Sequence, residues 1–162
     1  MNIFVLNCGS SSLKYKLYAM ENEEVLAEGK VERIGQDNAV ITHQSTGKEE
    51  VTKTMPILEH TVAIRESLNL LTHSEHGIIS DVNEINAVGH RVVHGGESFS
   101  DSVLVTDRTK DILDSLAELA PLHNPANVTG IRAAEQIMPQ TPQVAVFDTA
   151  FHSSIPPHGY LY

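Results

Sequence analysis

The chain has 162 residues, of which 41% are hydrophobic and 20% charged, and its 11 Lys and Arg against 21 Asp and Glu give a formal net charge of −10. These values are typical of one globular domain with its own core, and they exclude a disordered or fibrous chain. The acidic balance argues against a nucleic-acid groove or an anionic membrane surface as the main partner. A small anionic substrate would need a local group of donors that outweighs the overall charge.

Cys8 is the only cysteine, so an intramolecular disulfide is impossible and a disulfide-stapled secreted scaffold is excluded. The apolar run at 3–6 is far shorter than the about 20 residues that span a bilayer, and it lacks the basic start of a secretory signal. We therefore expect a cytoplasmic protein.

The opening third has the pattern of an antiparallel meander. Residues 2–7 form an apolar run with β-branched members, and residues 13–20 alternate between apolar and polar side chains. Strand character continues over 25–34 and 39–43, with turn-forming residues at 35–38 between them. These runs predict consecutive strands joined as hairpins.

The period changes at Pro56. The apolar positions now follow a helical spacing and predict one buried stripe made of Ile57, Thr61, Ile64, Leu68 and Leu71. A loop at 74–77 ends this helix. Residues 87–93 then predict another strand, which runs into His94-Gly95-Gly96 and a polar loop.

Two further helices and a strand follow. Asp107 is the predicted N-cap of a helix that buries Ile112, Leu116 and Leu119. Asn124-Pro125 has cap-then-proline chemistry and begins a helix that buries Val128, Ile131 and Ala134. Residues 143–147 are a buried-type strand. Together these elements predict a single α/β domain with a mixed sheet covered by helices on at least one side, without internal repeats.

The loop between the first two strands reads NCGSSSLKY. The backbone N–H groups of Gly9 and Ser10 to Ser12 are able to converge on a phosphate, with the hydroxyls and the Lys14 ammonium as further donors. The G-x-x-x-x-G-K-[ST] pattern is absent, and the loop joins two strands instead of a strand and a helix. A purely structural hairpin turn is the commoner use of such residues.

Arg91 stands among valines in the segment GHRVVHGG. Its planar guanidinium matches carboxylate or phosphate in a bidentate manner, so an arginine facing a cleft would anchor an anion. The alternative is an arginine that pairs with a sheet carboxylate or faces water. The i, i+4 spacing of His90 and His94 is typical of a metal-binding pair on a helix, but here it falls in a predicted strand. We therefore exclude a structural metal site.

Two more segments carry side chains that are suited to bind anions or metals. His123 precedes the helix start at Asn124, where free N–H groups and the positive end of the helix dipole favour an anionic oxygen; a simple capping role is the alternative. Asp148 follows the strand at 143–147, where a carboxylate commonly holds Mg²⁺ in phosphoryl transfer; capping of a following helix is the alternative.

These four segments resemble acetate kinases in order and in approximate spacing. The matching stretches are VLNCGSSSLKY, GHRVVHGG, APLHNPAN and VFDTAFH followed by PP and YLY. They lie near 1–18, 86–107, 117–130 and 143–162, whereas 21–85 is generic.

The resemblance implies a fold and an activity. The fold is a ribonuclease-H-like, actin-like ATPase domain with an antiparallel meander followed by parallel strands and crossover helices. The activity is reversible transfer of the γ-phosphoryl group of ATP to acetate, which gives acetyl phosphate and ADP with Mg²⁺ as cofactor. Residues 1–150 would form the N-terminal domain, and 151–162 would begin the connection to a C-terminal domain.

The resemblance also implies roles for individual residues. Contacts to ATP and its phosphates would come from Asn7, Ser10, Ser11, Ser12 and Lys14. Arg91 would bind the acetate carboxylate or the transferring phosphoryl group, and His123 would stabilise that group. Asp148 would assist catalysis and share the metal with Asn7, while Val93 and Leu122 would shape the pocket for the methyl group.

Three alternatives stay open at this point. A propionate or butyrate kinase would share these motifs, and a non-catalytic nucleotide-sensing domain would share the fold.

Acetate kinases are considerably longer than this chain, so we expect an isolated N-terminal domain without turnover of its own. The full-length protein is expected to be a homodimer and the isolated domain a monomer.

Overall fold

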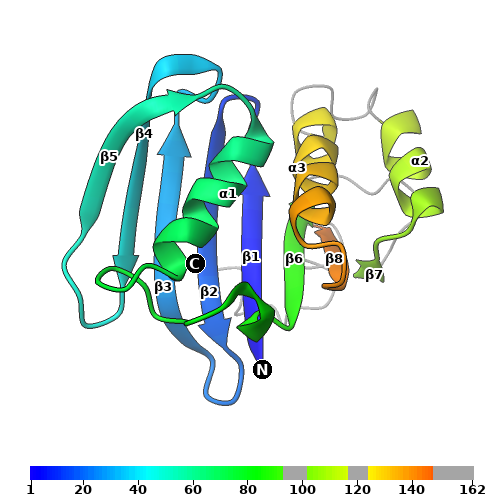
Figure 1. The fold of residues 1–162 in the computed structure, drawn as a ribbon. Coiled ribbons are helices and arrows are strands. Elements are labelled where there is room, and N and C mark those ends of the chain that lie inside the picture. Colours follow the sequence, from blue (N-terminus) through cyan, green and yellow to red (C-terminus); the bar gives the residue numbers. More distant parts are fainter. Residues whose placement is uncertain (93–101, 117–123, 148–162) are drawn as a thin grey trace, which may run out of the picture.

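The computed structural model of the chain describes residues 1–92, 102–116 and 124–147. Its centre is one eight-stranded sheet with the order β5-β4-β3-β2-β1-β6-β8-β7, and Figure 1 shows α1 and α3 lying across the same face. No helix in this described part of the chain is long and apolar enough to cross a membrane.

The first five strands form a continuous antiparallel meander, as expected for the opening third. Each strand pairs with the next one along the chain. Their bounds are β1 Asn2–Cys8, β2 Ser12–Ala19, β3 Glu24–Glu32, β4 Gln36–Ser45 and β5 Val51–Ile57. The alternation of apolar and polar residues fixes which side of each strand faces the helices.

The second half adds parallel strands to the same sheet. β6 (Ala87–Val92) pairs in parallel with β1, and β8 (Gln143–Phe147) pairs in parallel with β6. The short β7 (Val103–Leu104) runs antiparallel at the edge of β8. A mixed sheet with a meander followed by parallel strands and crossover helices is therefore confirmed.

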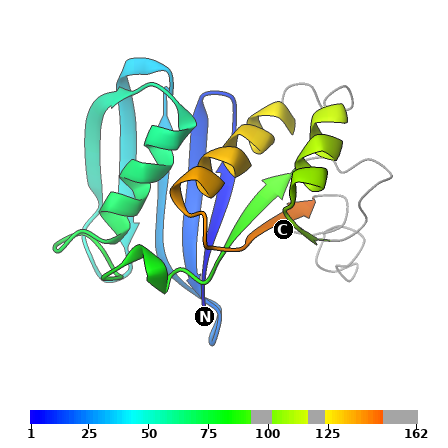
Figure 2. The same ribbon diagram turned by 45° about the vertical axis from the view of Figure 1, so that its right-hand side comes forward.

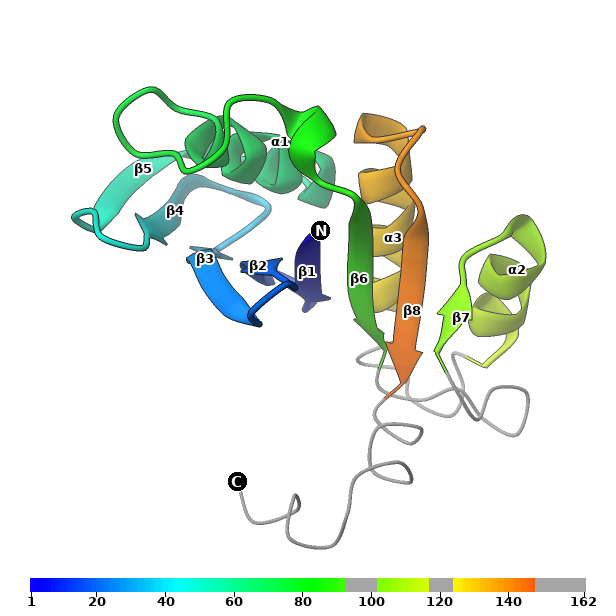
Figure 3. The same cartoon turned by 90° about the horizontal axis from the view of Figure 1, so that it is seen from below.

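The helices are α1 (His60–Leu71), α2 (Asp107–Ser115) and α3 (Asn124–Ile137), with a single 3₁₀ turn at Val82–Glu84. Figures 2 and 3 show α1 and α3 on one side of the sheet and α2 beside β7 at the flank. The other face of β1, β6 and β8 carries no helix of the described residues, and it is called the open face below.

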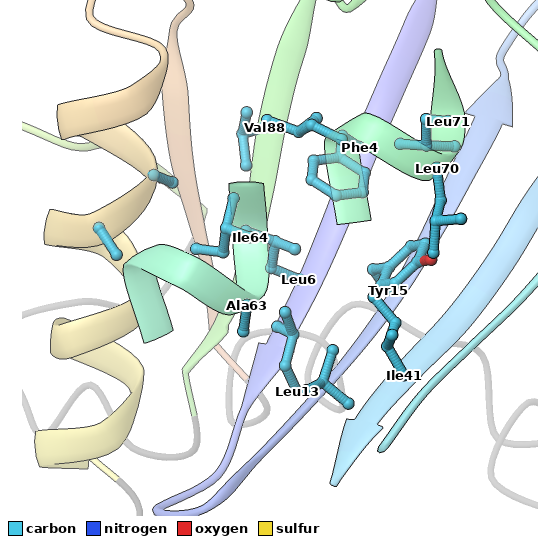
Figure 4. Close-up of a cluster of buried hydrophobic side chains, with 14 of the residues drawn as sticks. Phe4, Leu6, Leu13, Tyr15, Ile41, Ala63, Ile64, Leu70, Leu71 and Val88 are labelled. Atoms are coloured by element: carbon cyan, nitrogen blue, oxygen red, sulfur yellow. The ribbon is translucent and has the colours of Figure 1, made fainter. Parts of the chain in front are cut away.

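The core lies between the sheet and the α1–α3 layer. Phe4, Leu6 and Leu13 project from the strands toward Ile64 and Leu71 of α1, as Figure 4 shows, and all five are at most 1% exposed. Burial of large aliphatic and aromatic side chains contributes about 1.5 to 3 kcal/mol each, so this layer is the main source of stability. It also holds the carboxyl end of β1 firmly in place.

One strand was missed by the sequence pattern. Residues 51–57 form β5, and Pro56 lies inside it, so the helix begins at His60 and Ile57 belongs to the strand. β5 is an edge strand, where proline is tolerated because its missing N–H would face solvent. Ile64, Leu68 and Leu71 are buried as predicted, whereas Thr61 is only half-buried.

The predicted details of α2 were also wrong by one position. Thr106 is the N-cap and its hydroxyl accepts from the Thr109 amide, while Asp107 is the first helical residue. Thr109 and Leu113 are buried, whereas the predicted Ile112 and Leu116 are only half-buried, because α2 packs sideways onto α3 instead of facing the sheet. The two-residue β7 was not predicted, and Leu119 lies outside the described residues. The predicted α3 stripe of Val128, Ile131 and Ala134 is confirmed, as is β8.

Candidate active site

The carboxyl ends of β1, β6 and β8 meet at one edge of the sheet, because these three strands are parallel. In open α/β sheets this edge is where ligands bind. The first turns of two helices lie at the same edge: Nε2 of His60 is 2.7 Å from the Gly9 carbonyl oxygen, and Nδ2 of Asn127 is 2.9 Å from the Cys8 carbonyl oxygen. Neither helix has an acidic residue in its first turn, although Glu59 is the N-cap residue of α1.

Lys14, Asn7 and Arg91 lie in a row across three neighbouring strands. Asn7 pairs with Lys14 in the β1–β2 ladder. The β1–β6 register pairs Val5 with Gly89, so the same register two residues further on brings Asn7 beside Arg91. Residues two apart in a strand share a face, which places this row on the open face. Asn7 is half-buried, and Lys14 and Arg91 are exposed.

Two adjoining hollows follow this row on the open face. The first, of about 410 Å³, is lined by Asn7 and Lys14 among others. The second, of about 650 Å³, is lined by Arg91 together with the apolar Val144 and Val146 of β8. Val5 lines both, so they form one surface that joins polar donors to an apolar wall.

The first hollow is lined by charged side chains of both signs, namely Lys14, Lys16 and Lys30 with Glu28 and Glu50. Lys16 is 4.0 Å from the Glu28 carboxylate and Lys30 is 3.3 Å from that of Glu32, so these lysines are balanced. Within the described residues Lys14 forms no ion pair. Its ammonium is therefore a donor for a ligand, although the chain as a whole carries a charge of −10.

The serine loop, defined here as Gly9–Ser12, connects β1 to β2 beside this row. It closes through a 2.9 Å hydrogen bond from the Gly9 amide to the Ser12 carbonyl, and the Ile34 amide donates to the Ser11 carbonyl at 2.9 Å. A Cβ atom at position 9 would lie 2.7 Å from the Ser12 Oγ atom, so a larger residue there would require the Ser12 hydroxyl to rotate. Ser10 and Ser11 are exposed and Ser12 is half-buried, which leaves their hydroxyls within reach of a ligand.

Two titratable groups next to the row face the core. Burial raises the pKa of the Cys8 thiol to about 12, so it remains protonated and is no nucleophile. Burial lowers the pKa of His90 to about 4, and its Nε2 donates to the Gln143 Oε1 atom at 2.6 Å. His90 is thus a neutral core residue, on the opposite side of β6 from Arg91.

Several predicted site residues cannot be placed. Val93, Leu122, His123 and Asp148 lie outside the described residues, so their roles stay predictions. In the described ranges, no group of three His, Cys, Asp or Glu side chains is arranged to hold a metal. Of the predicted residues, the structure brings together Asn7, the serine loop, Lys14 and Arg91.

His60 and Asn127 were not among the site residues predicted from the sequence, although Asn127 ends the matching stretch APLHNPAN. Both contact the carboxyl end of β1, across 51 residues for His60 and 119 for Asn127. Local patterns do not report contacts at such separations. One sequence signal was available: both residues are polar, and both lie on helices that pack against the core, where a buried polar side chain needs a hydrogen-bond partner.

Comparison with known proteins gives a consistent picture. The model of the acetokinase family matches residues 2–162. The acetate kinase of Clostridium kluyveri is 53% identical over 162 residues, covering 100% of this chain and 40% of that protein. Among solved structures, Porphyromonas gingivalis acetate kinase has a TM-score of 0.90 at 44% identity, covering 97% of this chain and 39% of that one.

A propionate kinase from Francisella tularensis is similar too, with a TM-score of 0.83 at 38% identity over 97% of this chain and 39% of its own. The chain thus spans about 40% of the length of the curated relatives it matches. These structural matches confirm the expected actin-like ATPase fold. The chain belongs to the acetokinase family.

Proposed function

We propose that this chain is the N-terminal actin-like ATPase domain of an acetate kinase, with residues 1–150 as the domain and 151–162 as the start of the connection to a second domain. The reaction transfers the γ-phosphoryl group of ATP to acetate. A carboxylate oxygen of acetate bonds to the γ-phosphorus, the bond from that phosphorus to the bridging oxygen breaks, and ADP leaves. The observation that carries the proposal is the row of Lys14, Asn7 and Arg91 beside the serine loop in a chain of the acetokinase family.

Arg91 is the proposed anchor for acetate and the transferring phosphoryl group. Acetate is already a nucleophile as a carboxylate, so it needs no strong base. The protein's task is to position two anions and to offset their charge, for which a guanidinium fork is well suited. Arg91 is exposed at the carboxyl end of β6, next to an apolar wall that fits the methyl end of a short acid.

The serine loop and Lys14 are the proposed phosphate contacts. The loop offers the hydroxyls of Ser10, Ser11 and Ser12, and Lys14 adds a compact positive charge on the adjacent strand. Such combinations of amides, hydroxyls and an ammonium recur where proteins hold phosphates.

Asn7 and Asp148 are the proposed metal residues. Amide and carboxylate oxygens are hard ligands that suit Mg²⁺, and Asn7 presents its side chain on the open face beside the proposed phosphate contacts. When bound, the ion would neutralise charge on the phosphates. Asn7 and Asp148 would hold it, and Asp148 and His123 would also assist the transferring group.

Acetate is favoured over propionate or butyrate as the acceptor by the predominance of acetate kinases among the relatives. The similar propionate kinase makes propionate the second candidate. Val93 and Leu122 are the proposed pocket for the methyl group. Rates of the full-length enzyme with acetate, propionate and butyrate distinguish the acceptors, because a pocket sized for one methyl group penalises each added methylene by about 1 to 3 kcal/mol.

Arg91→Ala in the full-length enzyme tests the proposal. We expect kcat/KM for acetate to fall by about 10² to 10³, because one charged transition-state contact is lost. Arg91→Lys keeps the charge without the fork, and it should recover only part of the loss. An unchanged kcat/KM in Arg91→Ala would instead favour a non-catalytic nucleotide-sensing domain.

The remaining proposals concern the setting of the enzyme. We place it in the cytoplasm, with ATP, ADP, acetate and acetyl phosphate as its small-molecule partners and without a nucleic-acid or membrane partner. The full-length protein is proposed to be a homodimer, and this domain by itself a monomer.

A further inference from the structure

We infer that His60 and Asn127 are positioning residues of the serine loop, which they orient for phosphate through two backbone carbonyl groups. The inference rests on the proposed function, because it assigns a purpose to a loop that is proposed to bind ATP. It adds two residues from α1 and α3 whose side chains lie on the helical side of the sheet.

His60 fixes the peptide that joins Gly9 to Ser10. Its Nε2 atom is 2.7 Å from the Gly9 carbonyl oxygen, and the side chain is only 8% exposed. A carbonyl oxygen accepts and never donates, so the hydrogen is on Nε2. The bond ties the first residue of α1 to the first residue of the loop.

This contact sets the direction of the Ser10 amide. In a planar trans peptide the carbonyl of one residue and the N–H of the next point in opposite directions, and the described residues contain no cis peptide. Because the Gly9 carbonyl points at α1, the Ser10 N–H points away from it. Within the described part of the chain the Ser10 amide donates to no other residue, so it is available to an anion.

Asn127 fixes the preceding peptide in the same way. Its Nδ2 atom donates to the Cys8 carbonyl at 2.9 Å, with the side chain 3% exposed. The Gly9 N–H is thereby turned toward the Ser12 carbonyl and closes the loop at 2.9 Å. A Cβ atom at Gly130 would lie 2.4 Å from the Cys8 Sγ atom, so α3 sits directly against this end of β1.

The result is a loop in which every carbonyl group except that of Ser10 accepts a hydrogen bond within the described part of the chain. The carbonyl groups that accept hydrogen bonds belong to Cys8, Gly9, Ser11 and Ser12. Free carbonyl oxygens would repel a phosphate, whereas amides and hydroxyls attract it. Because the peptides of the loop are oriented before the ligand binds, the cost of ordering the loop during binding is avoided.

Three variants of the full-length enzyme test the inference. His60→Ala removes the donor, and His60→Gln carries an amide N–H in its place. Asn127→Asp keeps the shape and replaces the donor by an acceptor. The measurements are the Kd of ATP by titration calorimetry, kcat/KM for ATP, the KM of acetate, and the midpoint of urea unfolding.

We expect His60→Ala and Asn127→Asp to weaken ATP binding about tenfold, the scale of one lost positioning contact, with the KM of acetate unchanged. His60→Gln should stay within about threefold of the wild type, since it restores the donor. If His60→Ala does not fold, Asn127→Asp carries the test alone. Unchanged ATP binding in the folded variants overturns the inference.

His43→Ala is the matched control. His43 is also a buried histidine, 1% exposed and hydrogen-bonded to Tyr15 and Ser45, but it lies on β4 away from the loop. The His43→Ala variant should have a lower urea midpoint than the wild type and an unchanged Kd for ATP. If it weakens ATP binding as much as His60→Ala, the effect is general destabilisation and the inference fails.

Ser12→Ala and Lys14→Ala separate this inference from the proposed function. If neither changes the Kd of ATP, the loop does not bind phosphate and the proposed function is wrong at this site. If either weakens ATP binding while His60→Ala and Asn127→Asp do not, the proposed function stands and only the positioning role is overturned.

Discussion

Gly29 shows how little space individual residues have in this sheet. A Cβ atom there would lie 2.3 Å from the ring of Tyr15 and 2.6 Å from the Thr42 carbonyl oxygen. We expect Gly29→Ala to destabilise the chain by about 3 kcal/mol, because backbone on one side and a buried ring on the other must move. Gly89→Ala is the control, since its nearest neighbour would be 3.8 Å away. Urea unfolding of both variants checks this, and equal stabilities would contradict it.

His90 couples protonation to stability. Burial lowers its pKa from 6.5 to about 4 in the folded chain. Below pH 6.5 the unfolded chain therefore takes up a proton that the folded chain does not. The stability from this group is present above pH 6.5 and is lost as the pH falls toward 4, by on the order of 3 kcal/mol in total. Burial lowers the pKa of His43 as well, which acts in the same direction.

Urea midpoints measured at several values between pH 7.5 and 4 test this. His90→Gln keeps a donor for Gln143 and does not titrate, so its stability should depend less steeply on pH over the window from 6.5 to 4. A pH dependence as steep as that of the wild type would show that His90 is not responsible.

Between elements, one buried network ties β2, β4 and the turn after α1 together. Ser45 donates to the His76 carbonyl at 2.6 Å, so its oxygen accepts from His43 Nε2 at 3.1 Å. The other ring nitrogen, Nδ1, then accepts from the Tyr15 hydroxyl at 2.7 Å. The donor and the acceptor of each hydrogen bond in this network are therefore fixed, as a buried polar network requires.

Tyr15→Phe should cost about 1 to 3 kcal/mol, because it leaves a buried ring nitrogen of His43 without a donor. Tyr18→Phe is the matched control on the same strand, since among the described residues the Tyr18 hydroxyl has no hydrogen bond and its ring is half-buried. Thermal or urea unfolding measures both. A similar loss in the two variants would mean that the hydroxyl of Tyr15 is not what matters.

Elements with strong periodicity were predictable from the sequence, and weak ones were not. β8 matches its predicted bounds because its last four residues form a continuous apolar run, and α3 matches because cap, proline and buried stripe agree. β5 was missed because Thr52, Lys53 and Thr54 are all exposed, so the alternation that marks a strand is absent. At α2, Thr106 and Asp107 are both good caps, and only the packing on α3 decides between them.

The residues that the structure brings together at the candidate site were predictable where a single segment contained several polar or charged side chains. The serine loop and Arg91 stand out in the sequence, and the sheet register then brings Arg91 beside Asn7. His60 and Asn127 were not predictable, because their meaning depends on where two helices begin relative to β1. The roles of His123 and Asp148 remain predictions.

For the molecule as a whole, we expect this chain by itself to form no acetyl phosphate from ATP and acetate. It spans about 40% of the length of its acetate kinase relatives, and phosphoryl transfer requires both substrates to be enclosed and neutralised. The measurement is ³¹P NMR of the chain alone and of the full-length enzyme under the same conditions. Appreciable turnover by the chain alone would contradict the expectation.

The two outermost strands have a consequence for behaviour in solution. An unpaired strand edge is a template on which other copies can polymerise. At one end of this sheet β5 carries the exposed Lys53 and Pro56, which disfavour a further backbone ladder, and at the other end β7 is only two residues long. Both edge strands of the sheet thus disfavour fibre growth, even though the central strands are rich in strongly β-forming residues.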